Sequence, residues 1–112
     1  MIDRHDKVAS LLHEFAATYI REEANTDPLI TVTHTTVSPD YRRATIFFTT
    51  IPDEREEDAL IFLKRSGKDL RRLIMKRSNM KIIPHIEFAV DRGERHRQHI
   101  DDIARDINER KD

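Results

Sequence analysis

Residues 29–51 read LITVTHTTVSPDYRRATIFFTTI, and this stretch decides the fold class. Its two arms, Leu29–Ser38 and Arg43–Ile51, are rich in the β-branched and aromatic residues that favour pleated strands. Ser38-Pro39-Asp40 between the arms is typical of a turn. A connection this short favours antiparallel pairing, so the stretch predicts a β-hairpin.

The segment before the hairpin predicts an amphipathic helix over about Asp3–Glu23. Its apolar residues recur at spacings of three and four and form one stripe. The stripe consists of Val8, Leu11, Leu12, Phe15, Ala16, Tyr19 and Ile20. Asp27-Pro28 then ends the helix, because proline lacks a backbone N–H and restrains the residue before it.

The segment after the hairpin predicts a second helix that opens at Pro52-Asp53. Asp53 is placed to cap this helix, and Glu56 three residues later completes a capping-box-like pair. The acids of Asp53–Asp58 also suit the positive end of the helix dipole. The buried side of the helix is expected to consist of Ala59, Leu60, Phe62 and Leu63.

Gly67 interrupts this helical pattern, and a further helix is predicted from there to about Ser78, with Leu70, Leu73 and Ile74 facing inward. A third strand is predicted over Ile82–Asp91, where apolar and polar residues alternate. After a break at Arg92-Gly93, the segment Glu94–Lys111 predicts one more amphipathic helix. Its apolar stripe consists of Ile100, Ile103, Ala104 and Ile107.

The predicted order of elements is α, β, β, α–break–α, β, α. This order is typical of an α+β fold in which one small sheet carries its helices on one face. A chain of 112 residues fits a single domain of this kind.

The composition limits the class of protein. The chain has no cysteine, which excludes disulfides and thiolate metal sites and suits a reducing cytosol. No apolar run approaches the roughly 18–20 residues that cross a bilayer, and no signal region follows the charged N-terminus. These features predict a cytoplasmic protein. The formal net charge is only −1, so the distribution of charge is more informative than its total.

The segment Lys64–Lys81 holds eight basic residues against one acid, Asp69. On a helix, Lys68, Arg71, Arg72 and Lys76 share a face opposite the apolar residues and form a rigid row of cations. Such a row can bind RNA phosphates, although a solvated charged face is the alternative. The candidate RNA-binding residues are Lys64, Arg65, Ser66, Gly67, Lys68, Arg71, Arg72, Lys76, Arg77 and Lys81.

Gly67 has two interpretations, and the sequence leaves both open. It is either a helix C-cap, where glycine tolerates a left-handed conformation, or a point where an RNA backbone approaches a helix N-terminus.

Several short motifs follow one another in order between about Val8 and Asp91. They are Asp27-Pro28-Leu29, Val37-Ser38-Pro39-Asp40, Ala44-Thr45-Ile46-Phe47-Phe48, Ser66-Gly67, Leu70-Arg71 and Met80-Lys81-Ile82-Ile83-Pro84-His85-Ile86-Glu87-Phe88. In this order and at these spacings, the set resembles the bacterial ribosome-binding factor A family, a small member of the type II KH-like group.

The resemblance implies a KH-like domain of order α–β–β–α–kink–α–β, with its core at about residues 3–91 and a C-terminal helix at about 94–110 of the 112. The family's Ala-x-Gly kink falls on Arg65-Ser66-Gly67 when aligned on Gly67, whereas alignment from Pro84 puts Lys68 at the glycine position. The resemblance also implies binding to the small (30S) ribosomal subunit through 16S ribosomal RNA, a role in late subunit maturation, and no catalytic residues. We expect a monomer without a cofactor.

Three features that could suggest an enzyme or a metal site are weak. Ser66-Gly67-Lys68 lacks the second glycine and the hydroxyl residue of a nucleotide-binding loop. His96 and His99 lack the further ligands that zinc needs. Asp101, Asp102 and Asp106 alternate with arginines and fit a solvated helix face. The alternative to RNA binding is therefore a protein-interaction module whose basic helix meets an acidic protein partner.

Overall fold

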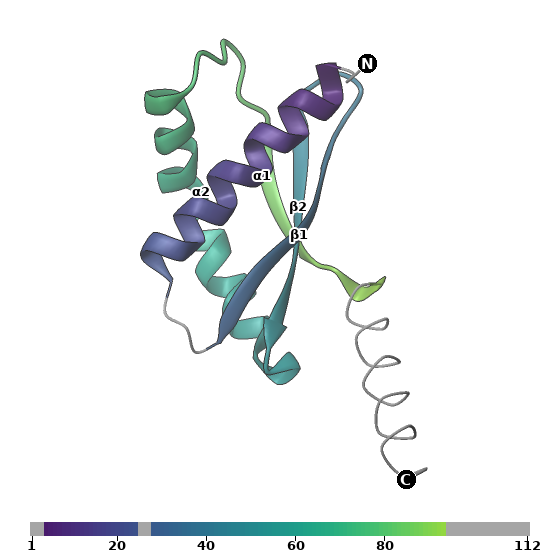
Figure 1. The fold of residues 1–112 in the computed structure, drawn as a ribbon, viewed down its shortest axis with the longest axis vertical. Coiled ribbons are helices and arrows are strands. Elements are labelled where there is room, and N and C mark those ends of the chain that lie inside the picture. The colour runs from purple at the N-terminus through teal and green to yellow at the C-terminus, as the bar shows by residue number, and fades with distance from the viewer. Residues whose placement is uncertain (1–3, 25–27, 94–112) are drawn as a thin grey trace, which may run out of the picture.

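The fold is described by a computed structural model over residues 4–24 and 28–93. The elements in chain order are α1 (Arg4–Glu23), β1 (Leu29–Val37), β2 (Arg43–Ile51), the 3₁₀ turn η1 (Asp53–Arg55), α2 (Glu56–Arg77) and β3 (His85–Val90). The three strands form one sheet, and α1 and α2 lie together against it (Figure 1). The α+β fold predicted from the sequence is confirmed.

The sheet is mixed, with the order β1-β2-β3. β1 and β2 pair antiparallel, as the hairpin pattern predicted, from Leu29 opposite Ile51 to Val37 opposite Ala44. β2 and β3 pair in parallel, because α2 carries the chain from the end of β2 back to the start of β3. β3 is therefore an edge strand beside α2, and this position creates the groove described below.

The core lies between the two helices and one face of the sheet. Alternate residues of β2 turn toward the helices, and Ala44, Ile46 and Phe48 are at most 1% exposed. The helices meet them with the buried stripes predicted from the sequence. These are Leu12, Ala16 and Ile20 of α1 and Ala59, Leu63, Leu70 and Ile74 of α2.

The predicted break at Gly67 is wrong, because α2 is one uninterrupted helix of 22 residues. Gly67 lies inside this helix and has no positive φ, so it is not a C-cap. The buried residues Leu63, Ser66, Leu70 and Ile74 continue one stripe across the glycine. A glycine inside a helix costs about 1 kcal/mol relative to alanine, and packing along this stripe outweighs that cost.

Two further boundaries differ from the sequence prediction. α2 begins at Glu56 after a 3₁₀ turn, and its N-cap residue is Arg55, so Asp53 does not cap it. The third strand begins at His85 and not at Ile82, because buried Pro84 has no N–H with which to join a strand ladder.

The predicted helix at Glu94–Lys111 and the helix stop at Asp27 lie outside the described residues. Among the residues that are described, neither helix is apolar enough over its length to cross a membrane.

Candidate nucleic-acid interface

All eight basic side chains of the segment Lys64–Lys81 are exposed. Seven of them belong to α2, and Lys81 lies in the loop that leads to β3. Asp69, the acid of this segment, approaches Arg72 at 3.9 Å, with both side chains more than 60% exposed. A surface pair of this kind is weak and screened by salt, so the segment keeps a strong positive charge.

A groove separates α2 from β3, and three of the cations lie along it. Two adjoining cavities of about 460 and 300 Å³ make up the groove, and Lys64 and Gly67 line both of them. Lys68 and Arg71 line the second cavity. A Cβ atom built at Gly67 would meet no atom within 4 Å, which shows that this side of the helix faces open space.

The helix geometry divides the predicted row of cations into two groups. The row consists of Lys68, Arg71, Arg72 and Lys76. At 100° per residue, Lys64, Lys68 and Arg71 fall within about 60° of one another and face the groove. Arg72 and Lys76 lie farther round the helix and do not line it. The cations thus form a groove-facing set and a flanking set.

The structure removes the side chain of Ser66 from the candidate interface. Ser66 is only 5% exposed, and its hydroxyl donates to the carbonyl oxygen of Phe62 at 2.8 Å. This bond to the residue four positions earlier stays within the helix. The sequence prediction that included Ser66 is wrong for its side chain, because position 66 falls on the buried stripe.

One residue that the sequence analysis did not propose, His85, lines the groove, and two basic residues of the β1–β2 connection lie next to it in the sheet. His85 lines it with a side chain that is 70% exposed, and its backbone N–H donates to the carbonyl oxygen of Arg42 at 2.8 Å. Arg43 pairs with His85 across the β2–β3 ladder. The adjacent basic pair Arg42-Arg43 is visible in the sequence, but only the parallel pairing of β3 with β2 places it beside His85.

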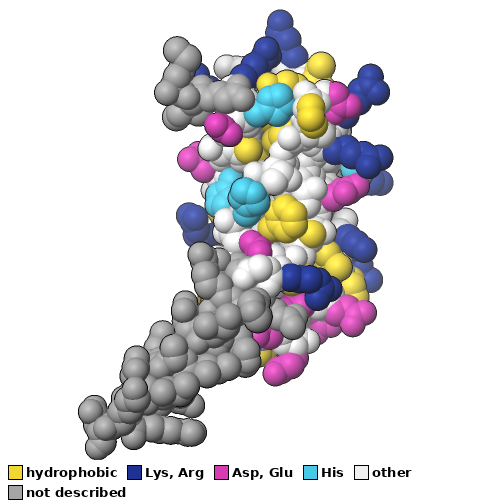
Figure 2. Space-filling model, turned by 90° about the vertical axis from the view of Figure 1, so that its right-hand side faces the viewer, with side chains coloured by type: hydrophobic (Ala, Val, Ile, Leu, Met, Phe, Trp, Pro, Cys, Tyr) yellow, Lys and Arg dark blue, Asp and Glu magenta, His cyan; other side chains and the backbone are white. Residues whose placement is uncertain are grey.

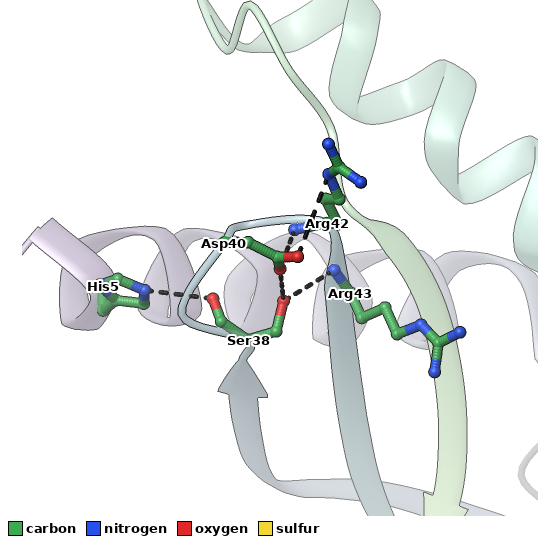
Figure 3. Close-up of polar contacts among 5 residues, drawn as sticks. All are labelled: His5, Ser38, Asp40, Arg42 and Arg43. Atoms are coloured by element: carbon green, nitrogen blue, oxygen red, sulfur yellow. Dashed lines mark hydrogen bonds and ion pairs between the residues drawn. The ribbon is translucent and has the colours of Figure 1, made fainter.

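The turn that carries Arg42 and Arg43 is held by a compact set of polar contacts (Figure 3). The Ser38 hydroxyl donates to Asp40 Oδ1 at 2.6 Å, and the Arg42 backbone N–H donates to the same oxygen at 3.1 Å. The Arg43 backbone N–H donates to Ser38 Oγ at 3.0 Å. The Ser38 hydroxyl, the Arg42 N–H and the Arg42 guanidinium together hold the pKa of Asp40 below its ordinary value of 3.8.

The face of the sheet that turns away from the described helices has a different character. His34 and Phe47 stack on it with ring centroids 5.9 Å apart. Figure 2 looks onto the side at the right of Figure 1, where basic side chains are mixed with acidic, histidine and hydrophobic ones. The concentration of cations is therefore a property of α2 and the loops around it.

The family of this chain is decided by comparison with known proteins. The family model described as ribosome-binding factor A matches residues 4–104. The chain belongs to the ribosome-binding factor A family. This is a family of ribosome-binding factors and not a known enzyme family.

Curated relatives named ribosome-binding factor A are similar over most of their length. The protein of Aromatoleum aromaticum is 35% identical, over 96% of this chain and 90% of its own. The protein of Trichlorobacter lovleyi is 32% identical, over 93% of this chain and 87% of its own.

Solved structures confirm the KH-like fold. The crystal structure of ribosome-binding factor A from Thermus thermophilus matches with a TM-score of 0.68 and 23% identity, over 77% of this chain and 93% of that one. A homology model of the Thermus thermophilus factor, fitted into a cryo-EM map of a complex of the 30S subunit with that factor, matches with a TM-score of 0.66 and 23% identity, over 77% of this chain and 93% of that one.

Proposed function

We propose that this protein binds 16S ribosomal RNA on the small ribosomal subunit and assists the late maturation of that subunit. Membership of the ribosome-binding factor A family supports the proposal, as does the relative that was fitted into a 30S complex. The observation that carries it is the groove between α2 and β3, with Lys64, Lys68 and Arg71 on one wall.

The rigidity of α2 suits it for binding phosphates. Leu63, Leu70 and Ile74 are fully buried along the stripe of the helix that faces the core, so the helix presents its cations without first ordering a loop. The groove is open along the edge strand β3, which lets an RNA strand lie between the helix and the sheet. If about five phosphates are neutralised, log K falls with log[salt] at a slope of roughly −3 to −4 for single-stranded RNA.

The proposed interface keeps nine of the ten residues expected from the sequence. They are Lys64, Arg65, Gly67, Lys68, Arg71, Arg72, Lys76, Arg77 and Lys81. We further propose that the chain acts as a monomeric single domain in the cytoplasm.

Two exposed apolar side chains on α2 favour a second candidate function. Ile61 is 46% exposed and Met75 is 63% exposed, and both belong to the helix that carries the basic row. Such residues could anchor an acidic protein partner whose charges meet the same cations. This candidate predicts binding to a protein surface that does not depend on RNA.

Sedimentation with purified 30S subunits tests the proposed function. The wild-type protein is expected to travel with the subunits through a sucrose gradient, and the variant Arg71→Glu is expected to remain largely at the top. Arg21→Glu is the matched control, because it changes the charge by the same amount at a different place. Arg21 lies beside β1, at the opposite edge of the sheet from the groove. A wild-type protein that never sediments with 30S subunits contradicts the proposal.

Equal sedimentation of Arg71→Glu and wild type would instead mean that α2 is not the interface. Ribonuclease treatment separates the two candidate functions. Loss of binding after cleavage of accessible rRNA supports RNA recognition, whereas binding that survives it favours the protein-interaction module.

A further inference from the structure

A separate cavity lies where three distant parts of the chain meet. The start of α1, the β1–β2 turn and the loop between α2 and β3 enclose about 510 Å³. We call it the Tyr41 cavity, and it is lined by residues 4, 8, 40–41, 79–82 and 84. Its volume falls within the roughly 300–1,000 Å³ of small-ligand sites. The groove-facing cations Lys64, Lys68 and Arg71 do not line this cavity.

The lining combines a flat aromatic ring, apolar side chains and two cations. Tyr41 supplies the ring, and Met80 and Ile82 supply apolar surface, with Ile82 72% exposed. Arg4, at the start of α1, and Lys81, in the loop between α2 and β3, contribute positive charge. This combination is typical of sites that stack an unpaired base and hold the phosphate beside it.

The ring of Tyr41 is fixed in place by its neighbours. It stacks on His5 with ring centroids 4.0 Å apart and an interplanar angle of 28°, and its hydroxyl lies 2.9 Å from His5 Nδ1. His5 Nε2 donates to the Ser38 carbonyl oxygen at 3.1 Å, which anchors the pair to the turn (Figure 3). The guanidinium carbon of Arg4 lies 5.8 Å from the centroid of the Tyr41 ring, within the range of a cation–π contact.

The backbone at Tyr41 adopts a conformation that this residue type rarely uses. Its φ is 61°, in the left-handed region, where a residue with a Cβ is strained by about 1–2 kcal/mol. The Tyr41 N–H donates to the Ser38 carbonyl oxygen at 3.0 Å, and this bond helps to hold the strained turn. The turn therefore keeps an aromatic ring at a position where glycine or asparagine would fit the backbone better.

The Tyr41 cavity adjoins the groove beside α2 at Pro84. Pro84 lines both of them, and Lys81 belongs to the same basic segment as the groove cations. A single RNA strand that leaves the groove past Pro84 would thus reach the Tyr41 ring, and the acid among the residues that line the cavity is Asp40. The carboxylate of Asp40 is already bonded to Ser38 and Arg42.

We infer that the Tyr41 cavity binds one unpaired nucleotide of the RNA, with the base against the Tyr41 ring and the apolar wall and the adjoining phosphate between Arg4 and Lys81. The inference rests on the proposed RNA binding and adds a preference for single-stranded RNA. A base inside a duplex cannot enter the cavity, because its faces are already stacked on its neighbours. An acidic peptide without aromatic residues could use the two cations, but it would leave the Tyr41 ring without a stacking partner.

Filter binding with a single-stranded RNA oligonucleotide, and with a duplex of the same sequence, tests the inference. Tyr41→Ala is expected to weaken single-strand binding by about 5- to 160-fold, the range for removing one stacking aromatic ring. Duplex binding is expected to change by less than about two-fold. Ile82→Ser, at an exposed position where folding is not threatened, is expected to act in the same direction and less strongly.

Fluorescence supplies an independent readout of contact. The chain has two tyrosines and no tryptophan, so Tyr19→Phe leaves Tyr41 as its single fluorophore. Single-stranded RNA is expected to quench the emission of this variant, and duplex RNA is not. Quenching by an acidic peptide in place of RNA overturns the inference.

The failures of the two proposals are distinguishable. If Tyr41→Ala and Ile82→Ser bind single-stranded RNA as the wild type does, while Lys68→Glu with Arg71→Glu does not bind, the cavity is not a nucleotide site and the RNA interface stands. If the wild-type protein binds neither RNA, the proposed function fails and the cavity inference fails with it.

Discussion

The backbone N–H of His85 donates to the carbonyl oxygen of Arg42 at 2.8 Å, and this bond ties the start of β3 to the β1–β2 turn. The ladder between β2 and β3 starts at the same place, where Arg43 lies opposite His85. The hydrogen bond between His85 and Arg42 therefore fixes the backbone next to both the groove beside α2 and the Tyr41 cavity. Buried Pro84, immediately before His85, lines both spaces. The geometry of the proposed interface thus depends on the β2–β3 pairing as much as on α2.

Replacement of Gly67 by alanine is expected to stabilise the protein. Gly67 lies within α2 without a positive φ, and a Cβ there meets no atom within 4 Å. Removal of the conformational freedom of glycine in the unfolded chain should raise the free energy of unfolding by about 0.5–1 kcal/mol. Chemical denaturation of wild type and Gly67→Ala measures the difference. A variant that is less stable than wild type would mean that α2 bends at this position in solution.

Truncation of Leu70 is expected to be severe. Leu70 is fully buried in the cluster formed by α1, α2 and β2, so Leu70→Ala should cost about 2–5 kcal/mol. Met75→Ala is the matched control on the same helix, because Met75 is 63% exposed and its loss should cost no more than about 0.5 kcal/mol. Equal losses in the two variants would show that the buried stripe of α2 is misassigned.

The charge of Asp40 is expected to stabilise the turn in a pH-dependent way. The pKa of Asp40 is below 3.8 in the folded protein, chiefly because the Ser38 hydroxyl donates to its carboxylate. A group with a lowered pKa binds protons less readily when folded, so its contribution is complete above the unfolded pKa and is lost as the pH falls through the folded value. Wild type should therefore melt slightly above Asp40→Asn at pH 7, and the gap should close below about pH 4.

Thermal melting of both proteins from pH 7 to pH 2 checks this prediction. Because Asp40 is at the surface, added salt should also narrow the gap at pH 7. Melting temperatures that stay parallel over the whole range would show that the carboxylate charge does not contribute.

Loss of the Ser66 hydroxyl is expected to leave RNA binding unchanged. The side chain is 5% exposed and bonds to the Phe62 carbonyl oxygen, so it is not available to a ligand. Ser66→Ala should bind single-stranded RNA within about two-fold of wild type, measured by filter binding. A large loss of affinity without a loss of stability would restore Ser66 to the interface.

The sequence predicts the fold well where the signal is local. The stripe with Leu12 and Ala16 on α1 and the hairpin pairing of Leu29 with Ile51 follow from residue periodicity and a short turn. The continuity of α2 was not predictable from propensity, because the weak preference of Gly67 yields to the tertiary packing of Leu63 and Leu70.

The candidate site was predictable only in part. The exposed cations of α2 are evident from composition and spacing, since a helix places Lys64, Lys68 and Arg71 on one side. The groove and the Tyr41 cavity join segments that are tens of residues apart, and no local pattern encodes those contacts. They follow from the parallel pairing of β3 with β2, which brings His85 beside Arg43.

The salt dependence of RNA binding tests the central claim most directly. We expect the wild-type protein to bind single-stranded 16S ribosomal RNA with a slope of log K against log[salt] of roughly −3 to −4. Lys68→Ala and Arg71→Ala should each reduce the magnitude of this slope by about one, whereas Arg21→Ala should not change it. A wild-type slope near zero, or equal slopes in all four proteins, would contradict the assignment of the α2 groove as the RNA interface.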